Sequence, residues 1–457
     1  MAQITEELSR TTPEAPVAKR AYPLLAVHAE RCTGCRMCEL ACSIKKAGRA
    51  DVSASRIRRN PKVPTAVAPS VCIQCTDPAC LKACPRGAIS KDAATGIVSI
   101  DHDKCVPCVL CSKACAFGGI QHSTLEGLVV KCDQCGGDPE CVKYCSSGAL
   151  EYVDNSQVYS ELGGREDLAS PGLSACLGCP AETLMRFTLK FFGRNTVLAL
   201  GPGCLAGTGS AGFGTLNGLR IPTYHSLLDN YASMLGGTRR AYNRIGKDFN
   251  PVVMAGDGGT ADVGFQSTSG AAERGENIIY ICYDNEGYMN TGIQRSGTTP
   301  RGAWTTTTPV GPSRRGKTQQ RKDMALLMAM HDLPYVATAT IGYPADYLRK
   351  LKRALEVLRS KRGMVYLHLF SPCPTGWRFA PEKSTRVCKM AVQTNFFPLW
   401  ECVDGEFRIT KPVPFPRPIE EYTRLMGKYA HLNRDEIDEY QADVDRRYRR
   451  LLALTRM

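Results

Sequence analysis

The second half of this 457-residue chain alternates short apolar runs with stretches of helical spacing. The apolar runs are rich in β-branched and aromatic residues, which is typical of strands. The predicted strands are Thr196–Leu200, Pro251–Ala255, Asn277–Tyr283, Tyr335–Ile341 and Met364–Phe370. The predicted helices are Glu182–Phe192, Ser226–Leu235, Val263–Glu273, Lys322–Met330 and Ala345–Ser360. This alternation favours an α/β fold, a mostly parallel sheet with helices on both faces.

The first part of the chain has a different composition, because it is rich in turn-forming residues and in cysteine. Sixteen of the 23 cysteines lie in four closely spaced groups. The groups are Cys32, Cys35, Cys38 and Cys42; Cys72, Cys75, Cys80 and Cys84; Cys105, Cys108, Cys111 and Cys115; and Cys132, Cys135, Cys141 and Cys145. Structural zinc is the alternative, but it usually takes well-separated cysteine pairs. Four groups at this spacing predict four 4Fe-4S clusters.

These groups resemble those of polyferredoxin-type electron-transfer subunits, over about residues 23–155. The resemblance implies that the fourth cysteine of each group serves a neighbouring cluster, with groups one and four exchanging ligands and groups two and three doing the same. The implied ligand sets are Cys32, Cys35, Cys38 and Cys145; Cys132, Cys135, Cys141 and Cys42; Cys72, Cys75, Cys80 and Cys115; and Cys105, Cys108, Cys111 and Cys84. Such clusters would pass single electrons from one to the next.

This change in composition divides the chain into segments. We expect a flexible tail over 1–22, a small α+β ferredoxin-like domain over 23–160 and a linker over 161–174. An α/β domain is expected over 175–400, and a C-terminal helical extension over 401–457. Within that extension, residues 418–455 predict two charged amphipathic helices.

One strand–helix turn in the second half carries candidate chemistry. The strand Pro251–Ala255 runs into Gly256, Asp257 and Gly258, and glycines let backbone N–H groups approach a phosphate. The next strand ends in Asp284 and Asn285. Parallel strand ends meet at one edge of a sheet, where carboxylate and amide oxygens suit Mg²⁺ and its phosphate ligand. Alone, a Gly-Asp-Gly turn is also an ordinary strand–helix connection.

The surrounding residues closely resemble the thiamine-diphosphate-binding β subunit of 2-oxoacid:acceptor (ferredoxin) oxidoreductases. The stretches that carry the resemblance are SACLGCPAETLMRFTLKFFGRNTVLALGPGC, VVMAGDGGTADVGFQSTSGAAERGENIIYICYDNEGYMNTGIQRSGTTP, GAWTTTTPVG and SPCPTGWRF, within about 173–400. The resemblance implies that Asp257 and Asn285 bind Mg²⁺ by side chain and Gly287 by its carbonyl. It places Asn290 and Thr291 by the diphosphate and the substrate.

The same resemblance implies a fifth, proximal 4Fe-4S cluster beside the thiamine diphosphate. Its ligands would be Cys176, Cys179, Cys204 and Cys373, a set that spacing alone does not assemble. Three cysteines remain. Cys282 lies in an apolar strand and is expected in the core, and no role is assigned to Cys388 or Cys402.

Two further residues are candidates for the catalytic site, together with Asn290. Glu182 follows the Cys176–Cys179 pair, and some members of the family carry the acid one position earlier. His225 lies in a stretch that the family uses near the cofactor. The alternative for a single histidine is a hydrogen-bonded structural residue.

The function implied is thiamine-dependent oxidative decarboxylation of a 2-oxoacid to an acyl-coenzyme A. Electrons would pass through 4Fe-4S clusters to ferredoxin or, through a flavin subunit, to NAD. The match to the family's pyrimidine-binding and coenzyme A domains is missing, so α-type and γ-type partner subunits are expected. The four-cluster N-terminal part suggests the phenylglyoxylate branch, while pyruvate, oxalate or another 2-oxoacid stays open. The alternative is a non-catalytic polyferredoxin electron-transfer subunit.

Charge and hydropathy exclude other classes. The formal charge is +14, but five cubes of roughly −2 each would bring it to about +4. No dense basic tract with interleaved aromatic residues is present, so nucleic-acid binding is not expected. No apolar run reaches 18 residues, and residues 1–20 lack an apolar signal segment. We expect a cytoplasmic protein of anaerobic metabolism.

Overall fold

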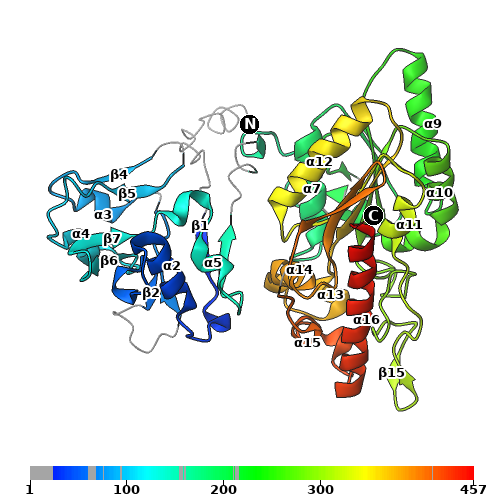
Figure 1. Ribbon diagram of the computed structural model, residues 1–457. Helices are drawn as coiled ribbons and strands as arrows, with labels where there is room; N and C mark the ends of the chain where they lie inside the picture. Colours follow the sequence, from blue (N-terminus) through cyan, green and yellow to red (C-terminus); the bar gives the residue numbers. More distant parts are fainter. Residues whose placement is uncertain are drawn as a thin grey trace, which may run out of the picture. The chain divides into compact units, whose positions relative to one another are not determined.

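The computed structural model describes residues 24–59, 68–75, 77–92, 95–153, 158, 161–208, 210–211, 216–413 and 415–456. The chain divides into two compact units, Met1–Gly164 and Arg165–Met457, each drawn in Figure 1. The predicted tail over 1–22 lies outside the described residues.

The first unit is built from short elements around its cysteines. Its strands form antiparallel pairs: β1 (Leu24–Val27) with β8 (Leu150–Val153), β2 (Arg58–Arg59) with β3 (Pro69–Ser70), β4 (Ile89–Lys91) with β5 (Val98–Ile100), and β6 (Ile120–Ser123) with β7 (Leu128–Lys131). Its helices are α2 (Met37–Ala47), α3 (Ala79–Lys82), α4 (Leu110–Ala114) and α5 (Glu140–Lys143). The pairing of β1 with β8 joins the two ends of the unit.

Cysteines take a large part in the two apolar cores of this unit. One core packs Leu25, Ile57, Val71 and Leu150 with Cys42, Cys72, Cys132 and Cys141. The other packs Ile89, Val98, Ile120 and Val129 with Cys80 and Cys111. A small unit of this kind buries little aliphatic surface, so groups bound by its cysteines would contribute to holding it together.

The second unit contains an eight-stranded sheet in the order β12-β9-β13-β14-β18-β17-β19-β20. The first six strands are parallel: β12 (Thr223–His225), β9 (Thr196–Leu200), β13 (Asn250–Gly256), β14 (Ile279–Asp284), β18 (Val365–Phe370) and β17 (Tyr335–Thr340). The five predicted strands are confirmed to within two residues at each end. The parallel arrangement brings the carboxyl ends of β13, β14 and β18 to one edge.

Helices cover both faces of this sheet, as Figure 1 shows. On one face lie α7 (Pro180–Phe192) and α12 (Pro344–Arg359), and on the other lie α9 (Tyr231–Arg244), α10 (Phe265–Glu273) and α11 (Met324–Ala329). The α/β fold predicted from the sequence is confirmed. The predicted helix Ser226–Leu235 is displaced, because Thr223–His225 form an edge strand before a turn and α9 begins only at Tyr231.

The C-terminal part differs from a purely helical extension. Residues 399–411 form an antiparallel hairpin, β19 (Leu399–Val403) and β20 (Glu406–Lys411), which extends the sheet beyond β17. Helices follow, α15 (Ile419–Thr423) and α16 (Arg434–Leu454), and they pack on α14 (Ser384–Gln393) through buried aromatic side chains. The prediction of a helical extension was wrong for 401–411, because this segment pairs with the edge strand β17, a tertiary contact that sequence periodicity does not reveal.

The predicted linker over 161–174 is also partly incorporated into the second unit. Leu168 and Ala169 are buried, and Ala169 forms a bridge to Leu219. Asp167 pairs with Arg186 of α7 at 3.0 Å. Apolar burial and this ion pair fix the segment against the α/β unit.

Candidate active site and electron-transfer centres

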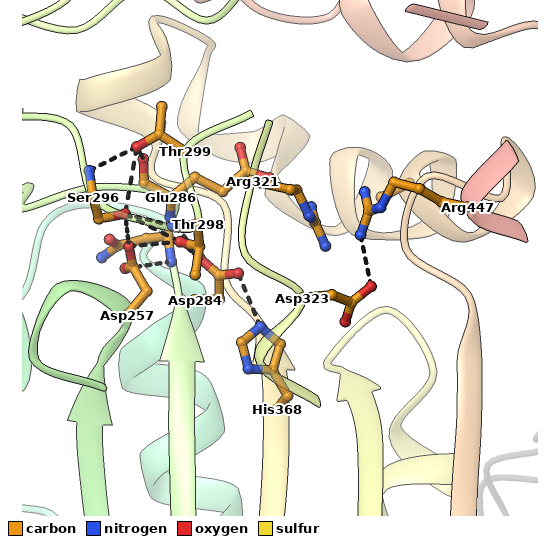
Figure 2. Close-up of polar contacts among 12 residues, drawn as sticks. Asp257, Asp284, Glu286, Ser296, Thr298, Thr299, Arg321, Asp323, His368 and Arg447 are labelled. Carbon is orange, nitrogen blue, oxygen red and sulfur yellow. Dashed lines mark hydrogen bonds and ion pairs between the residues drawn. The ribbon is translucent and has the colours of Figure 1, made fainter. Parts of the chain in front are cut away.

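Two aspartates meet at the carboxyl edge of the sheet. Asp257 follows β13 and Asp284 ends β14, and the register pairs the preceding residues Gly256 and Tyr283. Both carboxyl groups are buried, with at most 1 % of each residue exposed. Figure 2 shows them gathered at the strand ends beside the loop that carries Ser296 and Thr298.

Hydroxyl groups from that loop hold both carboxylates. Ser296 Oγ and Thr298 Oγ1 donate to Asp257 Oδ2 at 2.5 and 2.8 Å. Thr298 Oγ1 also lies 2.8 Å from Asp284 Oδ1. Burial, and then the charge of Asp284, raise the pKa of Asp257 well above its usual value. A bound cation would offset this electrostatic cost.

The arrangement of oxygens beside Asp257 fits a divalent cation. The side-chain oxygen of Asn285 faces two acceptors, Asp257 Oδ1 at 2.9 Å and the Gly287 carbonyl at 2.8 Å. A swapped amide would donate to both, whereas a cation among the three oxygens favours the amide oxygen pointing inward. One carboxylate, one amide oxygen and one backbone carbonyl form a hard donor set that Mg²⁺ prefers.

Two glycines at this edge lie against neighbouring groups so closely that a side chain at either position would clash. A Cβ at Gly258 would lie 2.4 Å from the ring of Tyr288, and a Cβ at Gly287 would lie 2.8 Å from the carbonyl oxygen of Gln294. Gly256 is less constrained, with the Tyr283 hydroxyl 3.2 Å from a Cβ there. The close approach of the backbone therefore requires glycine at positions 258 and 287.

A buried charged network lies behind the aspartates, and sequence reasoning did not find it. His368 Nε2 lies 2.9 Å from Asp284 Oδ2. Although burial opposes this, the hydrogen bond and charge of His368 lower the pKa of Asp284. The run Ser296–Thr299, inside one of the stretches that carried the family resemblance, was the signal for the hydroxyl part of this network.

A second part of the network fixes the backbone of Asn285. Glu286 pairs with Lys428 and, at 3.5 Å, with Arg321. The Lys428 ammonium also lies 3.1 Å from the ring centroid of Trp377, whose indole N–H donates to the Asn285 carbonyl at 2.9 Å. Segments far apart in the sequence thus hold one candidate ligand, which only a three-dimensional structure reveals.

The remaining predicted site residues lie nearer the surface. Asn290 and Thr291 are exposed, and Thr291 Oγ1 donates to Gln294 at 2.7 Å. His225 is exposed at the end of edge strand β12, two strands from β13. Glu182 lies in the first turn of α7, where it pairs with Arg186 at 2.8 Å. Their roles stay predictions.

The structure brings together the four cysteines predicted for the proximal cluster. Burial, and then the charges of Cys373, Cys179 and Cys176, raise the pKa of Cys204 to about 12. Burial, together with the charges of Cys179 and Cys176, raises the pKa of Cys373 to about 11. The Asn285 amide nitrogen lies 3.8 Å from Cys204 Sγ. The thiol group and the magnesium candidate are therefore direct neighbours.

In the first unit, cysteines of the predicted sets lie near one another, although Cys132 also lies near Cys72 and Cys141 near Cys38, which belong to other sets. Burial raises the pKa of several of these thiols, and the charges of neighbouring thiolates act in the same direction. Cys38 is affected by Cys145 and Cys32; Cys75 and Cys80 by Cys72 and Cys115; Cys105 by Cys84 and Cys108; and Cys141 by Cys132, Cys42 and Cys135. Cys32, Cys35, Cys38 and Cys145 line one cavity of about 250 Å³. Such proximity of buried thiols fits cationic iron centres.

The three remaining cysteines are buried in the second unit. Cys282 lies in the centre of β14, Cys388 in α14 and Cys402 in β19, each at most 1 % exposed. Cys282 packs in the main apolar core of the sheet, as its apolar surroundings in the sequence predicted.

Comparison with known proteins assigns both units. Residues 203–369 match the C-terminal TPP-binding domain of thiamine pyrophosphate enzymes, and residues 63–155 match the 4Fe-4S dicluster domain. The β subunit of NADH-dependent phenylglyoxylate dehydrogenase from Aromatoleum evansii is 46% identical over 430 residues, which cover 93% of this chain and 96% of that protein.

Two other relatives match a smaller part. Pyruvate synthase subunit PorB of Methanothermobacter thermautotrophicus is 45% identical, covering 61% of this chain and 96% of that protein. Ketoisovalerate oxidoreductase subunit VorB of Pyrococcus abyssi is 41% identical, covering 62% and 92%.

The chain belongs to the family of thiamine-diphosphate-dependent 2-oxoacid oxidoreductase β subunits. It binds thiamine diphosphate and iron–sulfur clusters and acts together with partner subunits. Among the described residues, no helix is long and apolar enough to cross a membrane.

Proposed function

We propose that this chain is the thiamine- and cluster-bearing subunit of an enzyme that oxidatively decarboxylates an aromatic 2-oxoacid to its acyl-coenzyme A. The convergence of three oxygens from Asp257, Asn285 and Gly287 at the sheet edge carries the proposal. This donor set supports catalysis at this edge rather than electron transfer alone.

The chain's own residues would hold Mg²⁺ and the diphosphate. Asp257, Asn285 and the Gly287 carbonyl would bind the ion, and the ion would in turn bind the diphosphate. When bound, thiamine diphosphate supplies an electron sink for decarboxylation of the 2-oxoacid. Ser296 and Thr298 keep Asp257 oriented through their hydroxyl groups.

Electrons would leave this site through the proximal thiol group. The contact between Asn285 and Cys204 supports a short path from the thiamine site to a cluster held by Cys176, Cys179, Cys204 and Cys373. Four further 4Fe-4S clusters in the first unit would carry single electrons onward. The total of five clusters follows from twenty cysteines at four per cube.

Partner subunits would complete the active site. The expected partners are an α-type subunit that binds the aminopyrimidine, a γ-type subunit and a flavin subunit that delivers electrons to NAD. Coenzyme A would take up the acyl group.

The extent of the match favours an aromatic substrate. The alignment with the phenylglyoxylate dehydrogenase β subunit covers 93% of the chain, so it extends into the N-terminal unit, whereas the alignments with the PorB and VorB subunits cover 61% and 62%. The purified complex should therefore be assayed with phenylglyoxylate, pyruvate and 2-oxoisovalerate, with coenzyme A and NAD present. We expect the highest kcat/KM for phenylglyoxylate, and a higher value for pyruvate or 2-oxoisovalerate would reject the aromatic assignment.

A further inference from the structure

Lys131 is the one buried lysine among the described residues of the first unit, with 7 % of the residue exposed. It ends β7 and immediately precedes Cys132. Burial of an ammonium group is costly unless an anion compensates its charge. The surroundings of Lys131 therefore indicate what kind of anion the folded unit provides.

Neutral groups make all the hydrogen bonds of this ammonium. Lys131 Nζ donates to the carbonyl oxygens of Val98 and Cys132, the latter at 2.9 Å, and to Gln74 Oε1 at 3.4 Å. In the described part of the chain, no carboxylate forms an ion pair with it. The partly exposed Lys46 differs, because it pairs with Asp133 at 2.7 Å.

Cysteine loops of two predicted clusters flank the ammonium. Lys131 is the residue before Cys132, and its ammonium donates to the Cys132 carbonyl at 2.9 Å and to the side chain of Gln74, which lies between Cys72 and Cys75. Cys72 and Cys75 belong to the set with Cys80 and Cys115, and Cys132 to the set with Cys42, Cys135 and Cys141. Gln74 also donates to the Cys132 carbonyl at 2.8 Å, so the cysteine loops of the two sets are in direct contact.

Gln74 joins the same two cysteine loops. It lies between Cys72 and Cys75 in a left-handed conformation (φ 53°) and is 5 % exposed. Its amide nitrogen donates to the Cys132 carbonyl at 2.8 Å, and its oxygen accepts from the Val98 N–H at 2.9 Å and from Lys131. This connection holds the ammonium between the two sets.

We propose that Lys131 is a redox-tuning residue, a fixed positive charge that raises the reduction potentials of the two clusters on either side of it. These are the clusters of Cys72, Cys75, Cys80 and Cys115 and of Cys42, Cys132, Cys135 and Cys141. Net charge near a cluster sets its potential, because a nearby cation stabilises the more negative reduced form. The inference rests on the proposed four-cluster content of the first unit.

Potentiometric titration monitored by electron paramagnetic resonance tests this on the purified holo-complex. The variants are Lys131→Gln, which removes the charge, and Lys131→Arg, which keeps it. Lys45→Gln is the matched control, since it removes the same charge from an exposed position of α2, where solvent screens it. Iron content is measured first, so that a missing cluster is distinguished from a shifted one.

In Lys131→Gln we expect the reduction potentials of two clusters to fall by about 59 mV. For a one-electron couple this corresponds to an equilibrium constant for reduction that is about tenfold smaller. Lys131→Arg and Lys45→Gln should stay near wild type. Loss of iron in Lys131→Gln with wild-type iron in Lys131→Arg would also support a required charge. Unchanged potentials at full iron content, or equal loss of iron in both Lys131 variants, would overturn the proposal. Low iron in the wild-type complex would instead reject the four-cluster content.

Discussion

One atom of the Asn285 side-chain amide lies 2.8 Å from the carbonyl oxygen of Gly287 and 2.9 Å from Asp257 Oδ1. The amide nitrogen at this position donates to both oxygens, whereas a divalent cation bound between them would be met by the amide oxygen. Sequence-distant groups maintain this arrangement, since the Asn285 carbonyl accepts from Trp377 and Asp257 accepts from Ser296 and Thr298.

Replacement of Asp257 by asparagine should abolish cofactor retention. The variant keeps the side-chain shape but removes the only carboxylate of the three-oxygen set, so affinity for Mg²⁺ and thiamine diphosphate should fall by about 100-fold or more. Acid release of thiamine from the purified complex measures the loss, while iron content should not change. Asp229→Asn, at an exposed position, is the control. Full thiamine occupancy in Asp257→Asn would show that this edge is not the binding site.

Thr298→Val should weaken the same site without removing an ion ligand. Its hydroxyl lies 2.8 Å from both Asp257 and Asp284, so valine leaves two buried carboxylates facing each other with fewer hydrogen bonds. We expect 10- to 100-fold weaker Mg²⁺ binding, measured by titration of the metal-depleted complex. Thr306→Val is the control, because it removes an exposed hydroxyl that donates to the Gly292 carbonyl, away from the two aspartates. This variant should bind Mg²⁺ with wild-type affinity. Equal affinities in the two variants would contradict the positioning role.

Two cysteine variants test the proximal cluster. Cys373→Ser should lower the iron content from about twenty to about sixteen atoms per chain, because one cube loses a ligand. Cys388→Ser should leave the iron content unchanged, because Cys388 is buried in α14. Burial raises the pKa of its thiol, and no other cysteine contributes to that shift. Iron analysis and spin quantification decide between them. Equal iron in the two variants would remove Cys373 from the ligand set.

Lys317 should make the stability of the complex depend on alkaline pH. Its ammonium is buried and donates to the carbonyl of Thr299 at 2.6 Å, and burial lowers its pKa to about 8. Between pH 8 and 10.5 the unfolded chain then binds more protons than the folded chain, so Lys317 increases stability as pH rises, by at most about 1.4 kcal/mol per pH unit.

The comparison with Lys317→Met isolates this effect. The difference in unfolding free energy or melting temperature between the two proteins should be independent of pH below about 8 and should shift in favour of wild type above it. A constant difference from pH 7 to pH 10 would show that Lys317 titrates as an exposed lysine does.

Much of the fold follows from local patterns. The parallel strands were predictable because they are short, apolar and separated by helical stretches. The edge elements were not, since the strand Thr223–His225 has only three residues and the outer strand of the hairpin, Glu406–Lys411, is largely exposed. Their conformations depend on the neighbouring strand rather than on their own composition.

The candidate site divides in the same way. Asp257, Asn285 and the cysteines belong to recognisable motifs, so their proximity was predicted. The support from His368, Trp377 and Lys428 comes from residues that lie 84 to 142 positions further along the chain than their partners. Trp377 lies in the stretch SPCPTGWRF, but nothing in the sequence indicates that its indole would reach Asn285. Such contacts form only after the strands and the C-terminal helices pack.

Single-turnover reduction of the clusters tests the central claim most directly. The anaerobic, oxidised complex is mixed with phenylglyoxylate and coenzyme A, and cluster reduction is followed by absorbance and electron paramagnetic resonance. We predict rapid reduction of the wild-type clusters, and no reduction in Asp257→Asn at wild-type iron content. Wild-type complex that retains thiamine diphosphate and about twenty irons, yet is reduced by no 2-oxoacid, would contradict the account.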